Sequence, residues 1–108
     1  MTPQEAQSLL QAGKAILVDV REEFELRQSG IAEGAVWMPL SAIEDETDQW
    51  REFRAKLPKD KQILLYCKVG GRSARVADCL ACEGFNTVNI GGFCEWKGAG
   101  LPVVPFKG

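Results

Sequence analysis

The stretch LLYCKVGGRSARVAD, residues 64–78, passes from an apolar run through a cysteine and two glycines into a segment with helical periodicity. Two adjacent glycines cost conformational entropy that packing in a buried strand does not recover, so a purely structural role gains nothing from this order. At the junction of a strand and a helix, backbone N–H groups lack partners, and glycines allow them to turn inward around an anion. The sequence therefore predicts an anion-binding loop around Cys67.

The first anion that such a loop would hold is the thiolate of Cys67. An ordinary cysteine, with a pKa near 8.5, is only about a few per cent ionised at neutral pH, so a reactive thiolate needs a lower pKa. Inward N–H groups, the helix dipole and the cations Lys68 and Arg72 all favour the charged form. The chain contains no histidine, which excludes a Cys-His dyad and a histidine general base.

Composition places this loop in one small domain. The chain has 108 residues, of which 45% are hydrophobic and 26% charged, a size at which one compact core closes. Its formal net charge of -2 provides no overall positive field for nucleic acid or anionic membranes. No apolar run approaches the roughly 20 residues of a membrane span, and the N-terminus does not resemble a signal peptide. We therefore expect one domain over residues 1–108, in the cytoplasm, without nucleic-acid or membrane partners.

Strands and helices are expected to alternate along the chain. Capping-box patterns at 2–5 and 41–44 mark two helix starts. Strands are predicted over 16–20, 35–38, 62–66 and 87–90, and helices from 3 to a stop at 13, up to 28, from 41 to 58, over 73–83 and around 96. Such alternation implies a parallel sheet covered by helices on both faces. Ligands of such sheets bind beyond the carboxyl ends of the strands, where Cys67 falls.

Three motifs together resemble the single-domain rhodanese family of sulfurtransferases across essentially the whole chain. They are C-K-V-G-G-R-S at 67–73, L-V-D-V-R-E at 17–22 and G-G-F-C-E-W-K-G-A-G-L-P-V at 91–103. The first matches the family's loop Cys-x-x-Gly-x-Arg-Ser position by position. One departure lies at 29–35, where the chain has S-G-I-A-E-G-A and lacks the histidine and proline that many members carry there. The local geometry of that segment is therefore not predicted.

The resemblance implies an α/β domain with a five-stranded parallel sheet and helices on both faces. It implies that Cys67 attacks the outer sulfur of a small anionic donor such as thiosulfate, becomes a persulfide, and passes the sulfur to cyanide, a thiol or a partner protein. A basic residue directly after the cysteine, here Lys68, is associated in the family with thiosulfate instead of mercaptopyruvate. Neither a metal nor a cofactor is expected. The residues expected to surround the substrate are Lys68, Val69, Gly70, Gly71, Arg72 and Ser73.

The remaining cysteines are expected to be secondary. Cys79 and Cys82 lie near the C-terminal end of a predicted helix, where a thiolate is disfavoured, and we interpret them as packing or surface thiols. They form the only closely spaced pair, which is too few ligands for zinc. Cys94 lies at a strand-to-helix turn on the same side as Cys67, so sulfur transfer or a disulfide between the two remains an alternative.

The sequence favours structural roles for two charged residues and three tryptophans. Asp19 and Arg21 share one side of a strand near its carboxyl end. A salt bridge that fixes the following turn is favoured there over binding of a substrate anion by Arg21. Core or interface positions are the simplest interpretation of Trp37, Trp50 and Trp96.

Two other classes of function remain as alternatives. A cysteine phosphatase or arsenate reductase uses a similar loop after a strand, but the loops of those enzymes are one residue longer than the segment between Cys67 and Arg72. The shorter loop suits a single sulfur atom better than a tetrahedral phosphate. A non-catalytic binding module of the same fold is the second alternative, and the intact cysteine in an intact loop argues against it.

Overall fold

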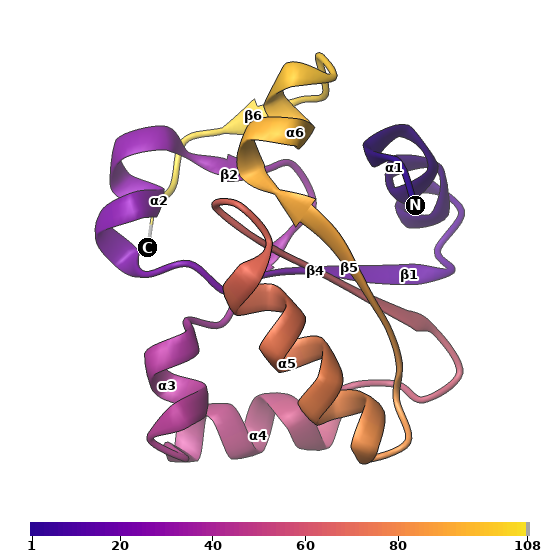
Figure 1. Ribbon diagram of the computed structural model, residues 1–108, viewed down its shortest axis with the longest axis vertical. Coiled ribbons are helices and arrows are strands. Elements are labelled where there is room, and N and C mark those ends of the chain that lie inside the picture. The colour runs from indigo at the N-terminus through magenta and orange to yellow at the C-terminus, as the bar shows by residue number, and fades with distance from the viewer. Residues whose placement is uncertain (108) are drawn as a thin grey trace.

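A parallel four-stranded sheet runs through the centre of the computed structural model, which describes residues 1–107 (Figure 1). Its strands lie in the order β3-β1-β4-β5, and each neighbouring pair is parallel. The strands are β1 (Ala15–Asp19), β3 (Val36–Trp37), β4 (Gln62–Cys67) and β5 (Asn86–Gly92). This arrangement confirms the predicted α/β class.

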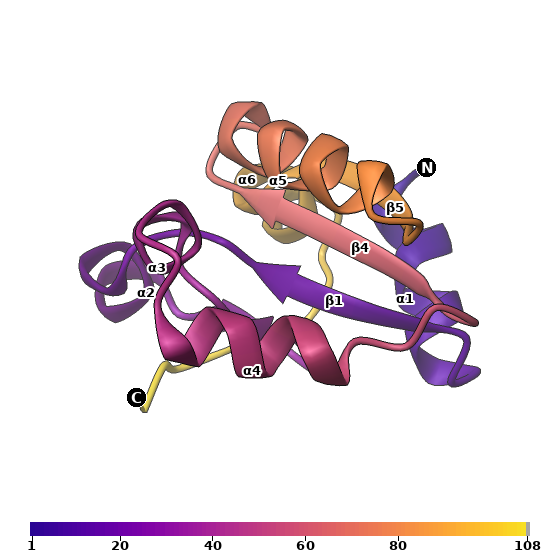
Figure 2. The ribbon, with the colours of Figure 1, turned by 90° about the horizontal axis from the view of Figure 1, so that it is seen from below.

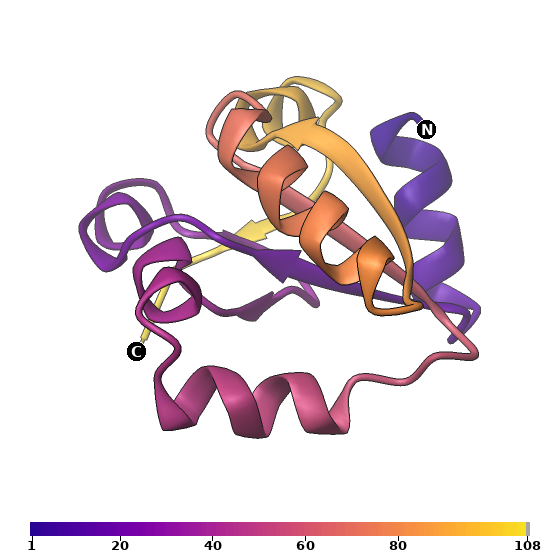
Figure 3. The same ribbon diagram turned by 60° about the horizontal axis from the view of Figure 1, so that its bottom comes forward.

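Helices cover both faces of this sheet, as Figures 2 and 3 show from two further directions. One face packs against α1 (Pro3–Gln11) and α6 (Phe93–Gly98). The other face packs against α3 (Leu40–Glu44), α4 (Asp48–Lys56) and α5 (Gly71–Cys82). The short helix α2 (Glu23–Ser29) follows β1 and lies beyond its carboxyl end. Within residues 1–107, no helix combines the length and the apolar character that a membrane crossing requires.

Alternation along β4 divides its side chains between two apolar cores. Ile63, Leu65 and Cys67 belong to the core beneath α3, α4 and α5, whereas Leu64 and Tyr66 belong to the core beneath α1 and α6. All of them are fully buried, which is why a central parallel strand is a nearly continuous apolar run. Cys67 is therefore the last residue of a buried strand, and its side chain lies on the α5 side.

The expected number of five strands in the sheet is wrong, because the main sheet has four. Two further short strands, β2 (Ile31–Ala32) and β6 (Val103–Val104), pair antiparallel in a separate ladder. Gly30 precedes β2 with a left-handed φ of 82°, and a Cβ there would lie 2.5 Å from the Val104 carbonyl oxygen. Residues 31–32 therefore pair with the C-terminal segment and not with the main sheet.

One of the two predicted capping boxes is confirmed, and the other is wrong. The Thr2 hydroxyl accepts the Glu5 N–H at 3.1 Å, and the Glu5 carboxylate accepts the Thr2 N–H at 2.9 Å. Ser41, in contrast, lies inside α3, which begins one residue earlier at Leu40. The Ser41 hydroxyl donates to the Glu22 carboxylate at 2.6 Å, so a tertiary contact replaces the local cap.

The single helix expected between 41 and 58 is two helices. Glu46 adopts a left-handed φ of 52°, which interrupts the helical path after α3. Thr47 then caps α4, since its hydroxyl accepts the Trp50 N–H at 3.2 Å and donates to the Ala42 carbonyl at 3.1 Å. Trp50 is buried in the core, as expected from the sequence, and Leu57 at the end of α4 is buried with it.

Replacing the α4 cap tests how far this local contact stabilises the domain. Thr47→Ala removes the hydroxyl that satisfies an orphan N–H, and we expect a loss of about 1 kcal/mol in the free energy of unfolding, measured by urea denaturation. Thr47→Ser keeps the hydroxyl and is the matched control, with a loss well below that of the alanine variant. Equal losses in both variants would assign the effect to the Thr47 methyl group instead.

Candidate active site

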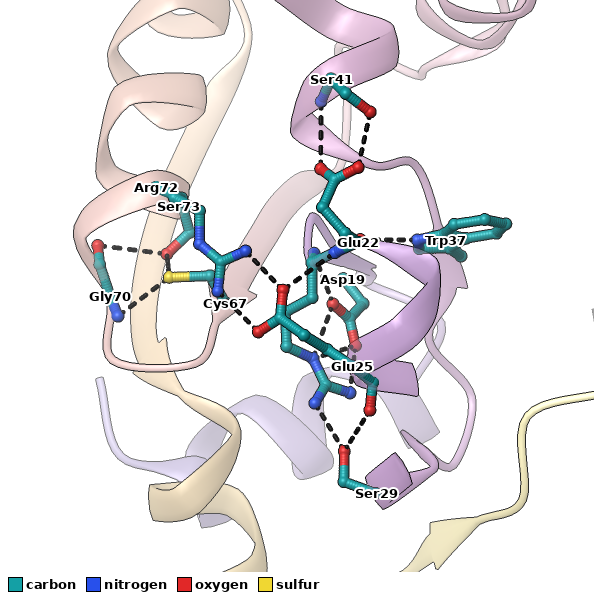
Figure 4. A network of polar contacts seen from close by, with 11 residues as sticks. Asp19, Glu22, Glu25, Ser29, Trp37, Ser41, Cys67, Gly70, Arg72 and Ser73 are labelled. Atoms are coloured by element: carbon teal, nitrogen blue, oxygen red, sulfur yellow. Dashed lines mark hydrogen bonds and ion pairs between the residues drawn. The ribbon is translucent and has the colours of Figure 1, made fainter. Parts of the chain in front are cut away.

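The Cys67 side chain lies buried beneath the turn that connects β4 to α5. The turn spans Lys68 to Gly70, and α5 begins at Gly71. Gly70 adopts a left-handed φ of 104°, a conformation that side chains other than glycine rarely adopt. This conformation directs the Gly70 N–H inward, where it donates to the Cys67 sulfur at 3.0 Å (Figure 4). The predicted inward turn of a loop amide toward this cysteine is confirmed.

Gly92 allows the turn to lie directly against β5. In the sheet register, Cys67 is paired with Gly92, after an irregularity in the ladder between Leu65 and Cys67. A Cβ at Gly92 would overlap the Lys68 carbonyl oxygen and would lie 3.0 Å from the Val69 Cα. The missing side chain is therefore a steric requirement of the loop.

Two opposing effects determine the pKa of Cys67. Burial raises the pKa, because a poorly solvated surrounding disfavours the thiolate. Hydrogen bonds lower it, with the largest of these contributions from the Ser73 hydroxyl, followed by the backbone N–H groups of Ser73, Gly70 and Val69. The hydrogen bonds outweigh burial, so the pKa of the Cys67 thiol lies below its ordinary value. No histidine takes part.

Asn89 positions the Ser73 hydroxyl beside the sulfur. The Ser73 oxygen lies 2.7 Å from the Asn89 Oδ1 and 3.5 Å from the Cys67 Sγ. The Gly70 carbonyl oxygen is a third acceptor, at 3.2 Å. Because a hydroxyl has one proton, the three acceptors compete for it, and a negatively charged sulfur binds that proton more strongly than a neutral thiol does. The Asn89 amide also donates to the Gly70 carbonyl at 2.9 Å and so fixes the other side of the turn.

Arg72 is tied to α2 by a bidentate ion pair. Its two terminal nitrogens donate to the Glu25 carboxylate at 2.6 and 2.8 Å (Figure 4). This contact holds the pKa of Glu25 below its ordinary value, and Glu25 in turn raises the pKa of Arg72, with a smaller contribution from Cys67. Arg72 therefore joins the first turn of α5 to the opposite wall of the site.

The salt bridge predicted between Asp19 and Arg21 is confirmed. Its closest N–O distance is 2.8 Å, and both residues are buried. Arg21 also donates to the Ser29 hydroxyl and to the Gly30 carbonyl, both at 2.7 Å. The guanidinium thus fastens the end of β1 to the C-terminal end of α2, and its position also places it over the Phe93 ring at 4.2 Å.

A cavity of about 400 Å³ opens beside the loop, between α2 and α6. Lys68 borders it directly after the buried cysteine, and Phe93 borders it directly after Gly92. The exposed Cys94 lies on its wall. Its lining consists of Arg21, Phe24, Glu25, Gln28, Ser29, Lys68, Phe93, Cys94 and Lys97.

Of the remaining predicted residues, Val69 contributes its backbone N–H to the Cys67 sulfur, and the others lie outside this immediate site. Val69 is highly exposed, at 79%, and Gly71 has open space where a Cβ would be. Cys79 and Cys82 are exposed free thiols on α5, which agrees with a surface role. Two of the three tryptophans are buried as predicted, while Trp37 is half-buried and donates to the Arg21 carbonyl at 2.8 Å.

Sequence reasoning missed three residues of the site: Glu25, Asn89 and Gly92. Asn89 carries a detectable signal, because a polar side chain near the carboxyl end of a parallel strand belongs to the ligand-binding edge. Glu25 carries none, since its partner Arg72 is remote in the sequence. Gly92 falls beyond the strand predicted over 87–90, whereas in the structure it is the last residue of β5 and lies against the loop backbone.

Comparisons with known proteins agree with this geometry. The model of the rhodanese-like domain matches residues 2–99, and the chain belongs to this family. A sulfurtransferase from Allochromatium vinosum is 30% identical over 105 residues, covering 95% of this chain and 91% of that protein. Thiosulfate sulfurtransferase GlpE from Actinobacillus succinogenes is 31% identical over 105 residues, covering 95% and 87%.

The solved structures give the same result. A rhodanese-related protein from Thermoplasma volcanium superimposes with a TM-score of 0.78 at 28% identity, covering 98% of this chain and 97% of that one. The domain is thus a rhodanese-like domain of the kind found in sulfurtransferases.

Removing the Ser73 hydroxyl should raise the pKa of Cys67. In a background in which Cys79, Cys82 and Cys94 are serine, Cys67 is the only thiol, and the ultraviolet absorbance of its thiolate can be titrated. Because the hydroxyl stabilises the thiolate, we expect Ser73→Ala to move this titration to higher pH. Ser41→Ala, which removes a hydroxyl far from the sulfur, is the control. An unchanged titration in Ser73→Ala would show that the backbone N–H groups alone hold the thiolate.

Adding a methyl group at Gly92 should displace the loop. Gly92→Ala places a Cβ against the Lys68 carbonyl, and we expect a loss of about 1–3 kcal/mol in the free energy of unfolding together with a raised pKa of Cys67. Gly98→Ala, at the end of α6 and with no heavy atom within 4 Å of its added Cβ, is the matched control and should be neutral or slightly stabilising. Wild-type stability and an unchanged Cys67 titration in Gly92→Ala would contradict the close approach.

Proposed function

We propose that this protein is a thiosulfate sulfurtransferase in which Cys67 carries the transferred sulfur as a persulfide. The observation that carries the proposal is the set of hydrogen bonds on the Cys67 sulfur, which lower its pKa in a chain without histidine. Relatives named as sulfurtransferases support the reaction class, and one named as a thiosulfate sulfurtransferase supports the donor. The proposal treats residues 1–108 as one functional domain.

The reaction divides into two displacements at sulfur. The Cys67 thiolate attacks the outer sulfur of thiosulfate, a bond forms between the two sulfur atoms, and sulfite leaves with the electron pair of the broken bond. A nucleophile, such as cyanide or a thiolate, then attacks the outer sulfur of the persulfide, and Cys67 leaves as a thiolate. The same hydrogen bonds serve both steps, because a low pKa gives a thiolate at neutral pH and also a good leaving group.

The neighbouring residues have separate roles in this proposal. Lys68 is an exposed cation at the mouth of the site and attracts the dianionic donor. Val69, Gly70 and Ser73 donate hydrogen bonds to the Cys67 sulfur. The negatively charged outer sulfur of a persulfide on Cys67 would accept hydrogen bonds from the same donors. Gly71 leaves open space beside the turn, and Arg72 fixes the loop against Glu25.

The proposal requires a sulfur adduct on Cys67. After incubation with thiosulfate and removal of the excess, the peptide that contains Cys67 should gain the mass of one sulfur atom and lose it when cyanide is added. Cys67→Ser should form no adduct and transfer no sulfur, because the nucleophile is gone while a buried hydroxyl can still accept the Gly70 N–H. Its fold is checked by circular dichroism and thermal unfolding.

Controls separate this reaction from the two alternatives. Cys79→Ser and Cys82→Ser replace exposed thiols away from the loop and should retain most of the activity. A phosphatase would hydrolyse an aryl phosphate and form no sulfur adduct, and a binding module would do neither. A folded wild-type protein that gains no sulfur from thiosulfate, mercaptopyruvate or a small persulfide would sink the sulfurtransferase assignment.

A further inference from the structure

We propose that the cavity between α2 and α6 binds the sulfur acceptor, and that Lys97, together with Lys68, selects low-molecular-weight thiols that carry carboxylates. The proposal rests on the sulfur transfer proposed above and names the class of its second substrate. It assigns a specificity role to Lys97, which lies in the last turn of α6 and takes no part in holding the thiolate.

The charge of the cavity wall comes from these two lysines. Four residues that are charged at neutral pH border the cavity: Arg21, Glu25, Lys68 and Lys97. Arg21 is neutralised by its buried partner Asp19, and Glu25 is neutralised by the bidentate contact with Arg72. Neither lysine forms an ion pair with any residue in 1–107. The cavity therefore presents two uncompensated positive charges.

The size and lining of the cavity fit an organic molecule better than a compact inorganic ion. Its volume of about 400 Å³ lies in the range of about 300–1,000 Å³ typical of small-molecule sites. Phe93 and Phe24 supply apolar walls, and Phe24 is unusually exposed for its type, at 64%. An aromatic surface suits the carbon skeleton of a ligand, while the lysines suit its carboxylates.

The position of the cavity suits the second displacement. Lys68 follows Cys67 directly, and Phe93 follows the residue that pairs with Cys67 across the sheet, so the cavity adjoins the loop from two sides. A thiolate whose carboxylates contact Lys68 and Lys97 would attack the outer sulfur of the persulfide. The new persulfide forms on the acceptor, and the Cys67 thiolate leaves with the electrons of the broken bond.

Discharge of preloaded protein tests the proposal. Cys67 is loaded with thiosulfate, excess donor is removed, and the second-order rate of sulfur loss is measured with mercaptosuccinate, 2-mercaptoethanol and cysteamine. For each thiol, the ratio of its rates with the variant and with the wild-type protein is independent of the intrinsic reactivity of that thiol. We expect Lys97→Ala to slow discharge by mercaptosuccinate roughly five-fold at low salt, to leave 2-mercaptoethanol unchanged, and to lose its effect as salt screens the charge.

Two further variants sharpen the result. Lys97→Glu should slow mercaptosuccinate further and accelerate cationic cysteamine, since the sign of the charge is reversed. Lys56→Ala, an exposed lysine on α4, is the matched control and should change none of the rates. Equal slowing of anionic and neutral thiols, or no slowing of either, would overturn the proposal and favour an acceptor that docks elsewhere, such as a protein.

A binding measurement keeps the proposal testable without a persulfide. (Methylthio)succinate has the same carboxylates but no thiol, so its affinity for the wild-type protein can be followed by NMR through the amides of α6. We expect Lys97→Ala to weaken this binding roughly five-fold and Lys56→Ala to leave it unchanged. Absence of binding, or equal binding by both variants, rejects the acceptor site even when Cys67 forms its persulfide. If (methylthio)succinate binding depends on Lys97 but Cys67 forms no persulfide, only the proposed reaction is rejected.

Discussion

The buried sulfur of Cys67 requires hydrogen-bond donors close to it, and much of the surrounding structure follows from that requirement. A buried thiolate without donors would be too costly to form. The Gly70 N–H reaches the sulfur because Gly70 adopts a left-handed conformation. The turn formed by residues 68–70 fits against β5 because Gly92 has no side chain. Two backbone positions thus convert a strand end into a site for a negatively charged sulfur.

Two ion pairs hold α2 in place beside this loop. The buried Asp19–Arg21 pair connects β1 with the end of α2, and Arg72 connects the first turn of α5 with Glu25 near the beginning of α2. A buried ion pair adds little net stability compared with apolar packing, but loss of one partner leaves an uncompensated charge and is strongly destabilising. The buried Asp19–Arg21 pair therefore fixes the geometry of the site more than it stabilises the fold. The two ion pairs also neutralise the charges of Arg21 and Glu25. The electrostatic potential of the neighbouring cavity therefore depends on Lys68 and Lys97.

The buried cysteine and the open cavity are separate parts of the site. Cys67 is fully buried, whereas the cavity beside it is open and lined by Phe24, Cys94 and Lys97 among others. The loop belongs to the family pattern, while the cavity wall comes from α2 and α6. Because function depends on the site more than on the fold, the proposed choice of acceptor would depend on the side chains of these two helices.

The α/β class, the loop and its cysteine were predictable from the sequence, because each depends on local order: an apolar run, two glycines and a helical stripe. The sequence also indicated the Asp19–Arg21 pair, whose members lie two residues apart. It did not determine the four-stranded sheet with its separate ladder, since β2 and β6 are two-residue strands that meet only in the folded chain. Nor did it determine the role of Ser41, where a contact with Glu22 overrides a local cap.

The residues that surround the sulfur could be identified only in the folded chain. Glu25 comes from α2, whereas Asn89 and Gly92 both come from β5, and no local pattern connects them with Cys67 or Arg72. Their proximity results from the parallel register of β4 and β5 and from the docking of α2 beyond β1. Periodicity and capping report on neighbours along the chain, whereas register and docking depend on side chains far apart in sequence that pack together only after folding.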